Sequence, residues 1–523
     1  MSWHRSVDGV HQLEKGLIVG IDVGTTETKA ILVGERGDLL SESSSELPLI
    51  QTKENWIEQD IQVIWKKTAK VIENCIKDID RRRLLCISVT GQRETICPLD
   101  RNFEPLRKAI SWQDARGWKI CKTMKQELGF EEIYKITGLP VNTMPCASKI
   151  AWIKENEQAI YDRAWKFVGI VDYIVWKLSG QLRIDFSNAC RTMLFDIAKL
   201  RWSERIIDYL ELDLDKMPEL IPSGHPVGNV TKKASEETDL PTIVEVVYAG
   251  GDQQCSALGV GITEQHRVSC VLGTCTNIEA YSDHLPLDKK LRLQAQLHVI
   301  PNSYLVEGGI GSSGSIYRWF RDNLGERETL AAKRCRTSPY AIMDAEAEKV
   351  EPGSSGLIMI PYFTGSLYPY WNADDRGMFV GLRLSHKRGH LLRAILEGIA
   401  YEYMRMAEDV ERITGTKIDQ VRFMGGGAKS KIWPKIIVDV LGVNGVVTKN
   451  TQAGAMGAAI LGSKACDLFK DIKDAAESMV KVGRRIAFDR VTHERYRRYC
   501  RIQGEVYGRI QDLVNELSQV DGA

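Results

Sequence analysis

Residues 17–26 read LIVGIDVGTT, an apolar run that leads into a polar turn with one glycine and two threonines. The run 17–21 predicts a buried strand, and 22–26 predicts a tight turn. A second strand is expected over 28–33, and a third from Leu39 onward. Strands that follow one another with no helix between them predict an antiparallel meander at the start of the fold.

A similar stretch begins about half a chain later. The strand-like run 268–272 leads into a turn, GTCTN at 273–277, and then into another strand-like run. When the Gly-Thr pair of the first turn is aligned with Gly273 and Thr274, strands fall in register on both sides. Because the two stretches open the two halves of the chain, we expect a duplicated architecture with a domain boundary near residue 260.

The rest of the chain alternates helices with strands. The segment 390–413 repeats apolar residues at three- and four-residue steps, which predicts a long amphipathic helix, and Gly415 stands where a C-terminal cap belongs. Beyond it the pattern predicts a strand at 421–424, a helix at 432–441, a strand at 446–447 and a small-residue helix at 454–461. The fold class is therefore expected to be α/β.

Composition excludes several classes of protein. A chain of 523 residues is too long for one core, so at least two domains are expected. The 70 basic and 69 acidic residues leave a net charge of +1, which argues against a nucleic-acid or membrane-surface partner. The twelve cysteines include no CxxC pair, which is typical of a reduced compartment. Residues 1–15 lack the apolar stretch of a signal peptide and no run is long enough to span a membrane, so we expect a cytoplasmic protein.

The first turn has the chemistry of a phosphate loop. Its glycine lets backbone N–H groups approach a phosphate, and the hydroxyls of Thr25 and Thr26 add donors. Asp22, at the end of the strand, can hold Mg²⁺ through water. An ordinary hairpin turn uses the same residue types, so both interpretations stand for this motif by itself. Gly273 and Thr274 in the second turn favour the phosphate loop, because two such loops can form a clamp.

A second acidic position lies in the sequence AGGDQQ at 249–254, which follows the apolar run 243–247. A carboxylate at the carboxyl end of a strand, flanked by glycine, can face a cleft and accept a proton from an attacking hydroxyl. The same residue, Asp252, can instead cap the helix predicted at 253–258. For this motif alone, the cap is the stronger interpretation.

The sequence GGGAKS at 425–430 opens a helix directly after a strand. Glycines there can let a nucleotide lie against the backbone, and a plain strand-to-helix turn is the alternative. The chain has no Walker A sequence, and this loop does not match the G-x-G-x-x-G fingerprint. The loop is therefore interpreted as neither a P-loop nor a dinucleotide-binding turn.

Two polar motifs suit a polyhydroxylated ligand. Arg93 and Glu94 follow a strand-like run and offer donors and acceptors to hydroxyl groups, although a surface turn with an ion pair has the same pattern. Trp112 can lie against the apolar face of a sugar, or it can fill a core.

Together these motifs resemble the FGGY carbohydrate kinases, a branch of the actin, hexokinase and heat-shock ATPase superfamily. The resemblance implies an α/β fold of two actin-like, ribonuclease-H-like domains around a central cleft. The domains are expected at 17–260 for the sugar and 261–523 for the nucleotide, with 1–16 as an N-terminal extension. The motifs that carry the resemblance, in order, are DVGTT (22–26), GQRET (91–95), SWQDAR (111–116), SNACRTMLFD (187–196), AGGDQQ (249–254), VLGTCTN (271–277), GGGAKSKIW (425–433) and AGAMGAAILG (453–462).

The resemblance also implies roles for individual residues, with ATP and Mg²⁺ as cofactors. Asp252 resembles the general base, and Asp22 resembles the acid that positions Mg²⁺. The positions that resemble the family's phosphate and adenosine contacts are Thr25, Thr26, Gly273, Thr274, Gly314, Gly427 and Lys431. The positions that resemble its sugar contacts are Arg93, Glu94, Trp112, Met144, Asp252, Gln253 and Asn277.

The expected substrate is a small sugar or polyol, and the motifs divide among branches of the family. GQRET and SWQDAR look closest to glycerol kinases, the stretch 144–149 reads more like xylulokinases, and autoinducer-2 kinases are a third relative. Met144 and Asn277 stand where glycerol kinases have aromatic residues, which should open and polarise the pocket. We therefore expect a ketopentose such as xylulose, with glycerol or the autoinducer-2 precursor as alternatives.

A different class of protein shares part of this pattern. An actin-like ATPase or a regulatory binding module would keep both phosphate loops and the nucleotide loop. It would not need Arg93, Glu94 and Trp112 to converge with Asp252 on a polyol, so an enzyme is the preferred interpretation. The oligomeric state stays open, with a homodimer among the alternatives.

Overall fold

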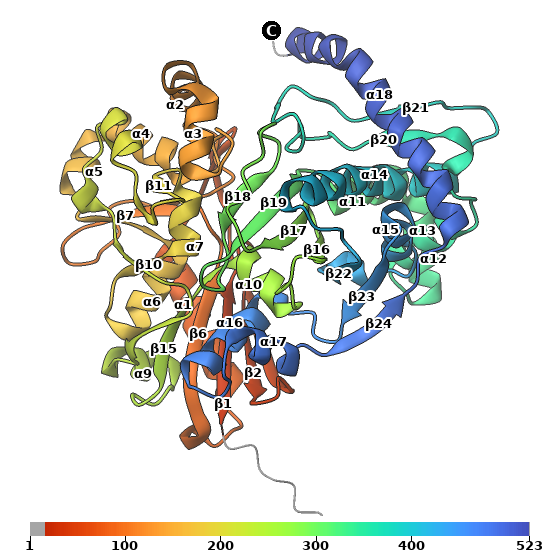
Figure 1. The fold of residues 1–523 in the computed structure, drawn as a ribbon. Coiled ribbons are helices and arrows are strands. Elements are labelled where there is room, and N and C mark those ends of the chain that lie inside the picture. The colour runs from red at the N-terminus through yellow and green to blue at the C-terminus, as the bar shows by residue number, and fades with distance from the viewer. Residues whose placement is uncertain (1–15, 522–523) are drawn as a thin grey trace, which may run out of the picture.

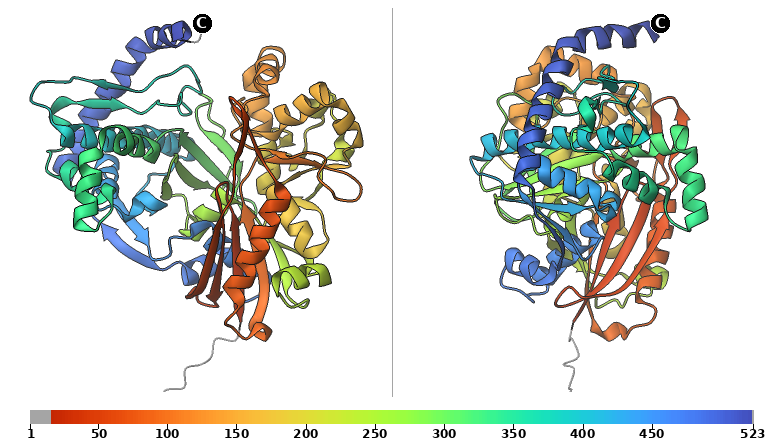
Figure 2. Two further views of the ribbon diagram at one scale, coloured as in Figure 1. Left: turned by 180° about the vertical axis from the view of Figure 1, so that it is seen from behind. Right: turned by 90° about the vertical axis from the view of Figure 1, so that its right-hand side faces the viewer.

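The computed structural model describes residues 16–521, which form two lobes, each built around its own mixed β-sheet (Figure 1). The expected N-terminal extension, 1–16, lies outside the described residues except for its last residue. One lobe is coloured red to yellow-green and the other green to blue, and Figure 2 shows the same division from behind. The chain thus has the two-lobed α/β architecture that the sequence predicts.

The first sheet begins with the predicted meander. β1, β2 and β3 pair antiparallel, and β6 and β15 then run parallel to β1. Glycine and polar residues occupy the β1–β2 turn, where the chain reverses within a few residues. The strands, in spatial order, are β14 (His225–Asn229), β15 (Glu245–Gly251), β6 (Leu84–Gly91), β1 (Leu17–Val23), β2 (Glu27–Gly34) and β3 (Leu39–Glu46).

The second sheet repeats this topology, which confirms the predicted duplication. Here β16, β17 and β19 pair antiparallel, β22 and β23 run parallel to β16, and β24 closes the edge antiparallel. One additional strand, β18, extends the other edge. The strands, in spatial order, are β18 (Gln294–Leu297), β19 (Tyr304–Ile310), β17 (Thr276–Ser282), β16 (Arg267–Leu272), β22 (Gln420–Met424), β23 (Asn444–Thr448) and β24 (Val482–Ile486).

Two helices join the lobes. α10 (Asp252–Gly259) follows β15, whereas α16 (Ala453–Ala465) comes from the second half of the sequence and still packs on β1 and β6 of the first sheet. Glycine makes this close packing possible, because a Cβ at Gly457 would lie 1.8 Å from the carbonyl oxygen of Cys255 on α10. The helices share one buried apolar cluster with residues of both sheets, so they connect the lobes at their base.

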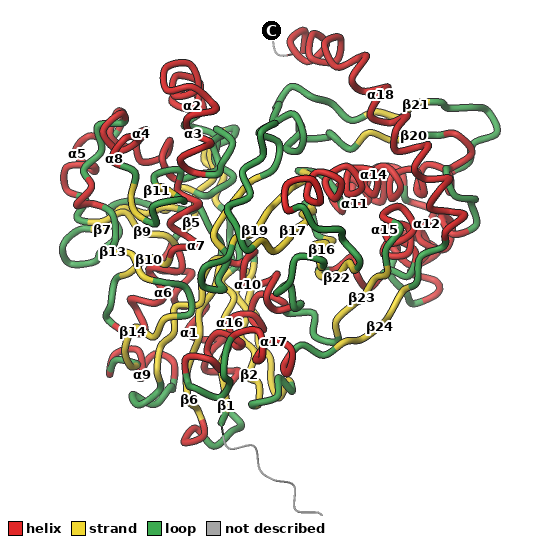
Figure 3. The backbone as a smooth tube through the Cα atoms, in the orientation of Figure 1, coloured by secondary structure: helices red, strands yellow, loops and turns green. Residues whose placement is uncertain are grey.

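The outer part of the first lobe carries a small additional sheet with helices around it, at the upper left of Figure 3. Its strands are β4 (Ile50–Lys53), β5 (Trp56–Gln59), β8 (Ala109–Ile110), β7 (Ile96–Leu99) and β9 (Lys166–Gly169). The helices near it are α2 (Trp118–Met124), α3 (Phe130–Thr137), α4 (Cys146–Asn156) and α5 (Gln158–Arg163).

The second lobe is organised around the long amphipathic helix that the sequence predicts. α14 (Arg388–Thr414) buries its apolar residues in the core of this lobe and ends at Gly415, whose φ of 70° is the left-handed conformation of a C-terminal cap. The other helices used below are α11 (Gly314–Leu324), α13 (Pro339–Glu348), α15 (Ile432–Leu441) and α18 (Arg490–Asp521).

All twelve cysteines are free thiols, and nine of them are buried. Among residues 16–521, no helix combines the length and the apolar character needed to cross a bilayer.

Candidate active site

The two predicted phosphate turns hold the same position in the two sheets, between the first strand and the second. Thr25 in the first turn accepts a hydrogen bond from Trp112 Nε1 at 2.9 Å, so this tryptophan contacts the loop itself. Thr26 is exposed, as is Thr274 in the second turn. Both loops therefore present a threonine at the end of a buried strand.

Asp22 lies on β1 immediately before the first turn. Its Oδ1 atom is buried and has no hydrogen-bond partner. Burial and the negative charge of Asp252 raise the pKa of Asp22 to about 7. Gly454 of α16 leaves space for this carboxylate, because a Cβ there would lie 2.4 Å from Oδ2. A buried carboxylate with an unbonded oxygen fits the position of a cation or of its bound water.

Asp252 is the first residue of α10, and the N-cap is Gly251. The interpretation of Asp252 as the helix cap is therefore wrong. Its Oδ1 accepts the backbone N–H of Gln253 at 2.8 Å and lies 3.3 Å from Arg93 Nε. Burial raises the pKa of this carboxyl to about 6, against the lowering effect of Arg93. The side chain keeps 24% of its surface exposed, so a ligand can reach it.

Arg93 bridges the two lobes. It follows β6 of the first sheet, and its Nη1 donates to Gln296 of β18 at 2.8 Å and to Glu307 of β19 at 3.1 Å. Burial raises the pKa of Glu307, but the charges of Arg93 and Arg191 and the hydrogen bonds from Gln296 and Arg93 together more than offset this effect, and the pKa falls to about 2. An ionised pair thus stands beside Asp252, held by residues more than 200 positions apart in the sequence.

Glu94 forms a second buried ion pair, with Arg191 at 2.6 Å. The backbone at Glu94 has a φ of 66°, in the left-handed region, and its side chain bonds to a different partner from that of Arg93. Lys149 donates to the carbonyl oxygens of Glu94 and Met144, so it holds the two predicted sugar-site segments together. Arg191 was not among the predicted contacts, although it lies inside the SNACRTMLFD motif.

The remaining predicted sugar contacts, Gln253, Met144 and Asn277, do not take part in these buried ion pairs. Gln253 lies beside Asp252, and its buried Oε1 has no hydrogen-bond partner. Asn277 is on β17 of the second sheet, with its Oδ1 next to Gly309, whereas Asp252 follows a strand of the first sheet. The roles of Gln253, Met144 and Asn277 stay predictions.

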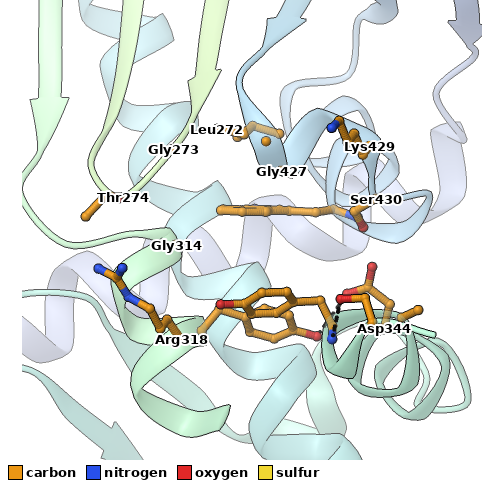
Figure 4. A pocket seen from close by; sticks show the side chains of 15 residues that line it. Leu272, Gly273, Thr274, Gly314, Arg318, Asp344, Gly427, Lys429 and Ser430 are labelled. Atoms are coloured by element: carbon orange, nitrogen blue, oxygen red, sulfur yellow. Dashed lines mark hydrogen bonds between the residues drawn. The ribbon is translucent and has the colours of Figure 1, made fainter. Parts of the chain in front are cut away.

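A cavity of about 630 Å³ opens in the second lobe, between the second turn and the glycine loop before α15 (Figure 4). Four predicted contacts line it, namely Gly273, Thr274, Gly314 and Gly427. Lys431 is exposed and does not line it, whereas Lys429 and Ser430, which precede it in the same loop, do. Lys431 follows the short 3-10 turn at 426–429 and is the N-cap of α15.

Further residues of this cavity were not found from the sequence. Tyr317 and Tyr340 stack with ring centroids 6.1 Å apart, and the Tyr317 hydroxyl donates to Asp344 at 3.0 Å. Burial raises the pKa of Asp344. In Figure 4, Thr274 and Arg318 lie toward one end of the cavity and Asp344 toward the other. Such a cavity has an aromatic part suited to a base and a part near Thr274 suited to phosphates.

Comparison with known proteins agrees with this geometry. The model of the FGGY family of carbohydrate kinases, N-terminal domain, matches residues 17–259, and that of the C-terminal domain matches 268–466. A gluconokinase of Bacillus subtilis (strain 168) is 30% identical over 464 residues, covering 88% of this chain and 90% of the relative. A xylulose kinase of Staphylococcus epidermidis is 29% identical over 508 residues, covering 96% and 99%.

Solved structures extend the likeness to the whole fold. The crystal structure of xylulose kinase from Rhodospirillum rubrum superposes with a TM-score of 0.86 at 28% identity, covering 95% of this chain and 99% of that one. The duplicated sheets, the paired turns and the family matches across both halves lead to one conclusion. The chain belongs to the FGGY family of carbohydrate kinases.

Proposed function

We propose that this carbohydrate kinase transfers the γ-phosphoryl group of ATP to a hydroxyl of a small sugar or polyol bound beside Asp252. The observation that carries the proposal is the position of Asp252, at the end of β15 and the start of α10, next to the buried pair of Arg93 and Glu307. With a pKa near 6, its carboxylate is ionised at neutral pH and is able to accept a proton.

In the proposed reaction, Asp252 takes the proton from the attacking hydroxyl as its oxygen approaches the γ-phosphorus. Arg93 keeps Asp252 ionised, and the bond from the Gln253 N–H fixes the orientation of the carboxylate. Thr25 and Thr274 would donate to the phosphate oxygens, and the 630 Å³ cavity would hold the nucleoside.

Asp22 is the residue proposed to hold Mg²⁺, directly or through water. Its unbonded buried oxygen and its raised pKa both favour a nearby positive charge. When bound, Mg²⁺ neutralises charge on the transferring phosphate. The described residues contain no group of three or more His, Cys, Asp or Glu side chains able to hold a metal ion. That composition suits Mg²⁺, which usually takes only one or two carboxylates and completes its shell with phosphate oxygens and water.

For the substrate we propose a ketopentose such as xylulose. The flexible Met144 and the polar Asn277 leave a wider and more polar wall than aromatic residues would, and extra hydroxyls can use that space. Xylulose kinases among the relatives that align over nearly the whole chain support this class.

Gluconate is the second candidate, because a gluconokinase aligns with the chain equally well. A sugar acid needs a cation for its carboxylate. The nearby cations, Arg93, Arg191 and Lys149, already bond to carboxylate or carbonyl oxygens. Gluconate would have to compete for one of them, which favours the uncharged sugar.

A coupled assay of ADP release tests both the proposed kinase reaction and the proposed ketopentose substrate. Xylulose, ribulose, ribitol, erythritol, glycerol, gluconate and the autoinducer-2 precursor are compared at matched concentrations, with Asp252→Asn as the inactive control. The highest kcat/KM is expected for a five-carbon ketose or polyol. Gluconate or glycerol as the best substrate would overturn the ketopentose, and ATP hydrolysis that no acceptor stimulates would overturn the kinase reaction.

A further inference from the structure

The C-terminal helix α18 is anchored along one face only. Tyr496, Cys500, Gln503 and Tyr507 are buried against the second lobe at three- and four-residue steps. Nearer its end, Gln511 donates to Asp375 at 3.2 Å. These contacts hold the helix in place and leave a neighbouring face open.

The open face carries an apolar stripe, made of Ile502, Val506, Ile510, Leu513, Leu517 and Val520. Val506 and Ile510 are half-buried, and Val506 also packs against the cluster of Tyr362 and Tyr507. The exposed fractions of Leu513, Leu517 and Val520 are 66%, 60% and 69%. The residues recur at steps of three and four, which is the spacing of a coiled-coil seam. Figures 1 and 2 show the end of α18 projecting beyond the rest of the molecule, so a partner can reach this stripe.

We infer that the stripe pairs with the same stripe of a second copy of this chain, with the two helices antiparallel about a twofold axis between Ile510 and Leu513. A twofold pair of this kind is self-complementary, because each copy offers the surface that the other needs. In this register, Leu513 of each copy lies opposite Ile510 of the other, and Val506 lies opposite Leu517.

The charges beside the stripe favour a second copy of this chain as the partner, and they favour the antiparallel direction. Two exposed residues of opposite charge, Arg509 and Glu516, flank the stripe on one edge, three residues after Val506 and Leu513. Antiparallel pairing brings Arg509 of each copy close to Glu516 of the other, which makes two matched ion pairs. A parallel pair would set like charges level with one another and would bring both anchored lobes to the same end.

The energetic cost of pairing is low. Two isolated helices of about 15 residues are marginal in water, because each must first be ordered. Here the lobe already orders α18, through Tyr507 and the bond from Gln511 to Asp375. The contact region from Val506 to Val520 is about 21 Å long, so the apolar gain is modest and a concentration-dependent dimer is expected.

Sedimentation velocity over a concentration series tests the pairing. The full chain should shift from monomer to dimer, and Leu513→Asp with Leu517→Asp should weaken the dimer by roughly 30-fold or more, as loss of a central contact does. Ile243→Asp is the matched control, because Ile243 is exposed to 79% but lies on the first lobe. A monomer at every concentration, or equal loss in the Ile243 variant, would overturn the inference.

Charge reversal tests the register. Arg509→Glu and Glu516→Arg should each weaken the dimer, and the double variant should restore it, because the ion pairs then re-form with their signs exchanged. A change in folding alone would not be rescued by the second substitution. Failure of the double variant to recover would refute the antiparallel register.

Thiol crosslinking tests the direction independently. In a Cys335→Ser background, which removes the exposed native thiol, Val506→Cys and Leu517→Cys are each treated with a mild thiol oxidant, alone and as an equimolar mixture. Only the mixture should give a disulfide-linked dimer, because each of these positions faces the other and not itself. Crosslinking of Leu517→Cys alone would indicate a parallel pair and would contradict the proposal.

Discussion

Asp252 is ionised at neutral pH because its surroundings balance two opposing effects. Burial raises its pKa, and Arg93 at 3.3 Å lowers it. Asp252→Asn should therefore lower kcat by about 10²–10⁴, the usual contribution of a general base. Calorimetry should show ATP binding unchanged, since Asp252 is not among the residues that line the cavity proposed for the nucleoside. Near wild-type turnover would remove Asp252 from the mechanism.

The same environment predicts a pH dependence. Asp252, with a pKa of about 6, and Asp22, whose pKa burial and the charge of Asp252 raise to about 7, must both lose protons, so kcat/KM should rise with pH and level off above about 8. The charge of Glu307 raises the pKa of Asp252, whereas Arg93 lowers it. Glu307→Gln should thus move the acid limb to lower pH, and Arg93→Gln should move it to higher pH.

Opposite shifts of the acid limb in the Glu307→Gln and Arg93→Gln variants are the decisive readout. If Arg93 and Glu307 had only a structural role, both variants would lower activity at every pH. Both variants should be checked for folding by thermal unfolding, since each leaves one buried charge without its partner. Shifts in the same direction would show that Asp252 does not set the acid limb.

At the scale of elements, the crossing of α10 and α16 depends on the absence of a side chain. A Cβ at Gly457 would lie 1.8 Å from the carbonyl oxygen of Cys255, a backbone atom of α10 that cannot move aside as a flexible side chain could. Gly457→Ala should destabilise the protein by about 1–3 kcal/mol, the usual cost of overpacking. It should also lower kcat, because Gly454 of the same helix packs against Asp22.

The control for this prediction is another helical glycine with open space. A Cβ added at Gly508 of α18 would have nothing within 4 Å, so Gly508→Ala should raise stability by about 0.5–1 kcal/mol. Thermal unfolding of the two variants separates helix propensity from packing. A lower Tm for Gly508→Ala, or an unchanged Tm for Gly457→Ala, would contradict the packing explanation.

At the scale of the whole molecule, we expect nucleotide and sugar to be held mainly by different lobes. A Cβ at Gly427 would lie 2.6 Å from the Trp433 ring, so Gly427→Val should push that ring into the cavity. The affinity for ATP should fall by about tenfold or more, equivalent to ~1.4 kcal/mol, while sugar affinity without nucleotide stays the same.

Gly426→Ala is the matched control, because nothing lies within 4 Å of its added carbon and it lines the same cavity. Its ATP affinity should remain close to that of the wild type. If Gly427→Val weakens sugar binding as much as ATP binding, the glycine supports the fold rather than the nucleotide site.

Much of the architecture could be predicted because it depends on short-range patterns in the sequence. The meander of β1 to β3, the second turn after β16, and the limits of α14 with its cap at Gly415 follow from alternation, helical periodicity and turn residues. Each of these signals lies within a few residues of sequence. The order of the family motifs then pointed to Asp22 and Asp252, and the fold brings them close enough for the charge of Asp252 to raise the pKa of Asp22.

Tertiary structure alone decided which side chains meet. The pairing of Arg93 with Glu307, the pairing of Arg191 with Glu94, and the place of Asp344 in the cavity of the second lobe have no local spacing that could reveal them. The capping interpretation of Asp252 was wrong for the same reason, since the end of β15 lets Gly251 take the cap and turns the carboxylate toward Arg93. Local sequence determines strands, helices and turns because their hydrogen bonds and side-chain periods are short-range. Buried ion pairs join segments that are far apart in the sequence, within the first lobe for Glu94 and Arg191 and between the lobes for Arg93 and Glu307, and only the folded chain brings those segments together.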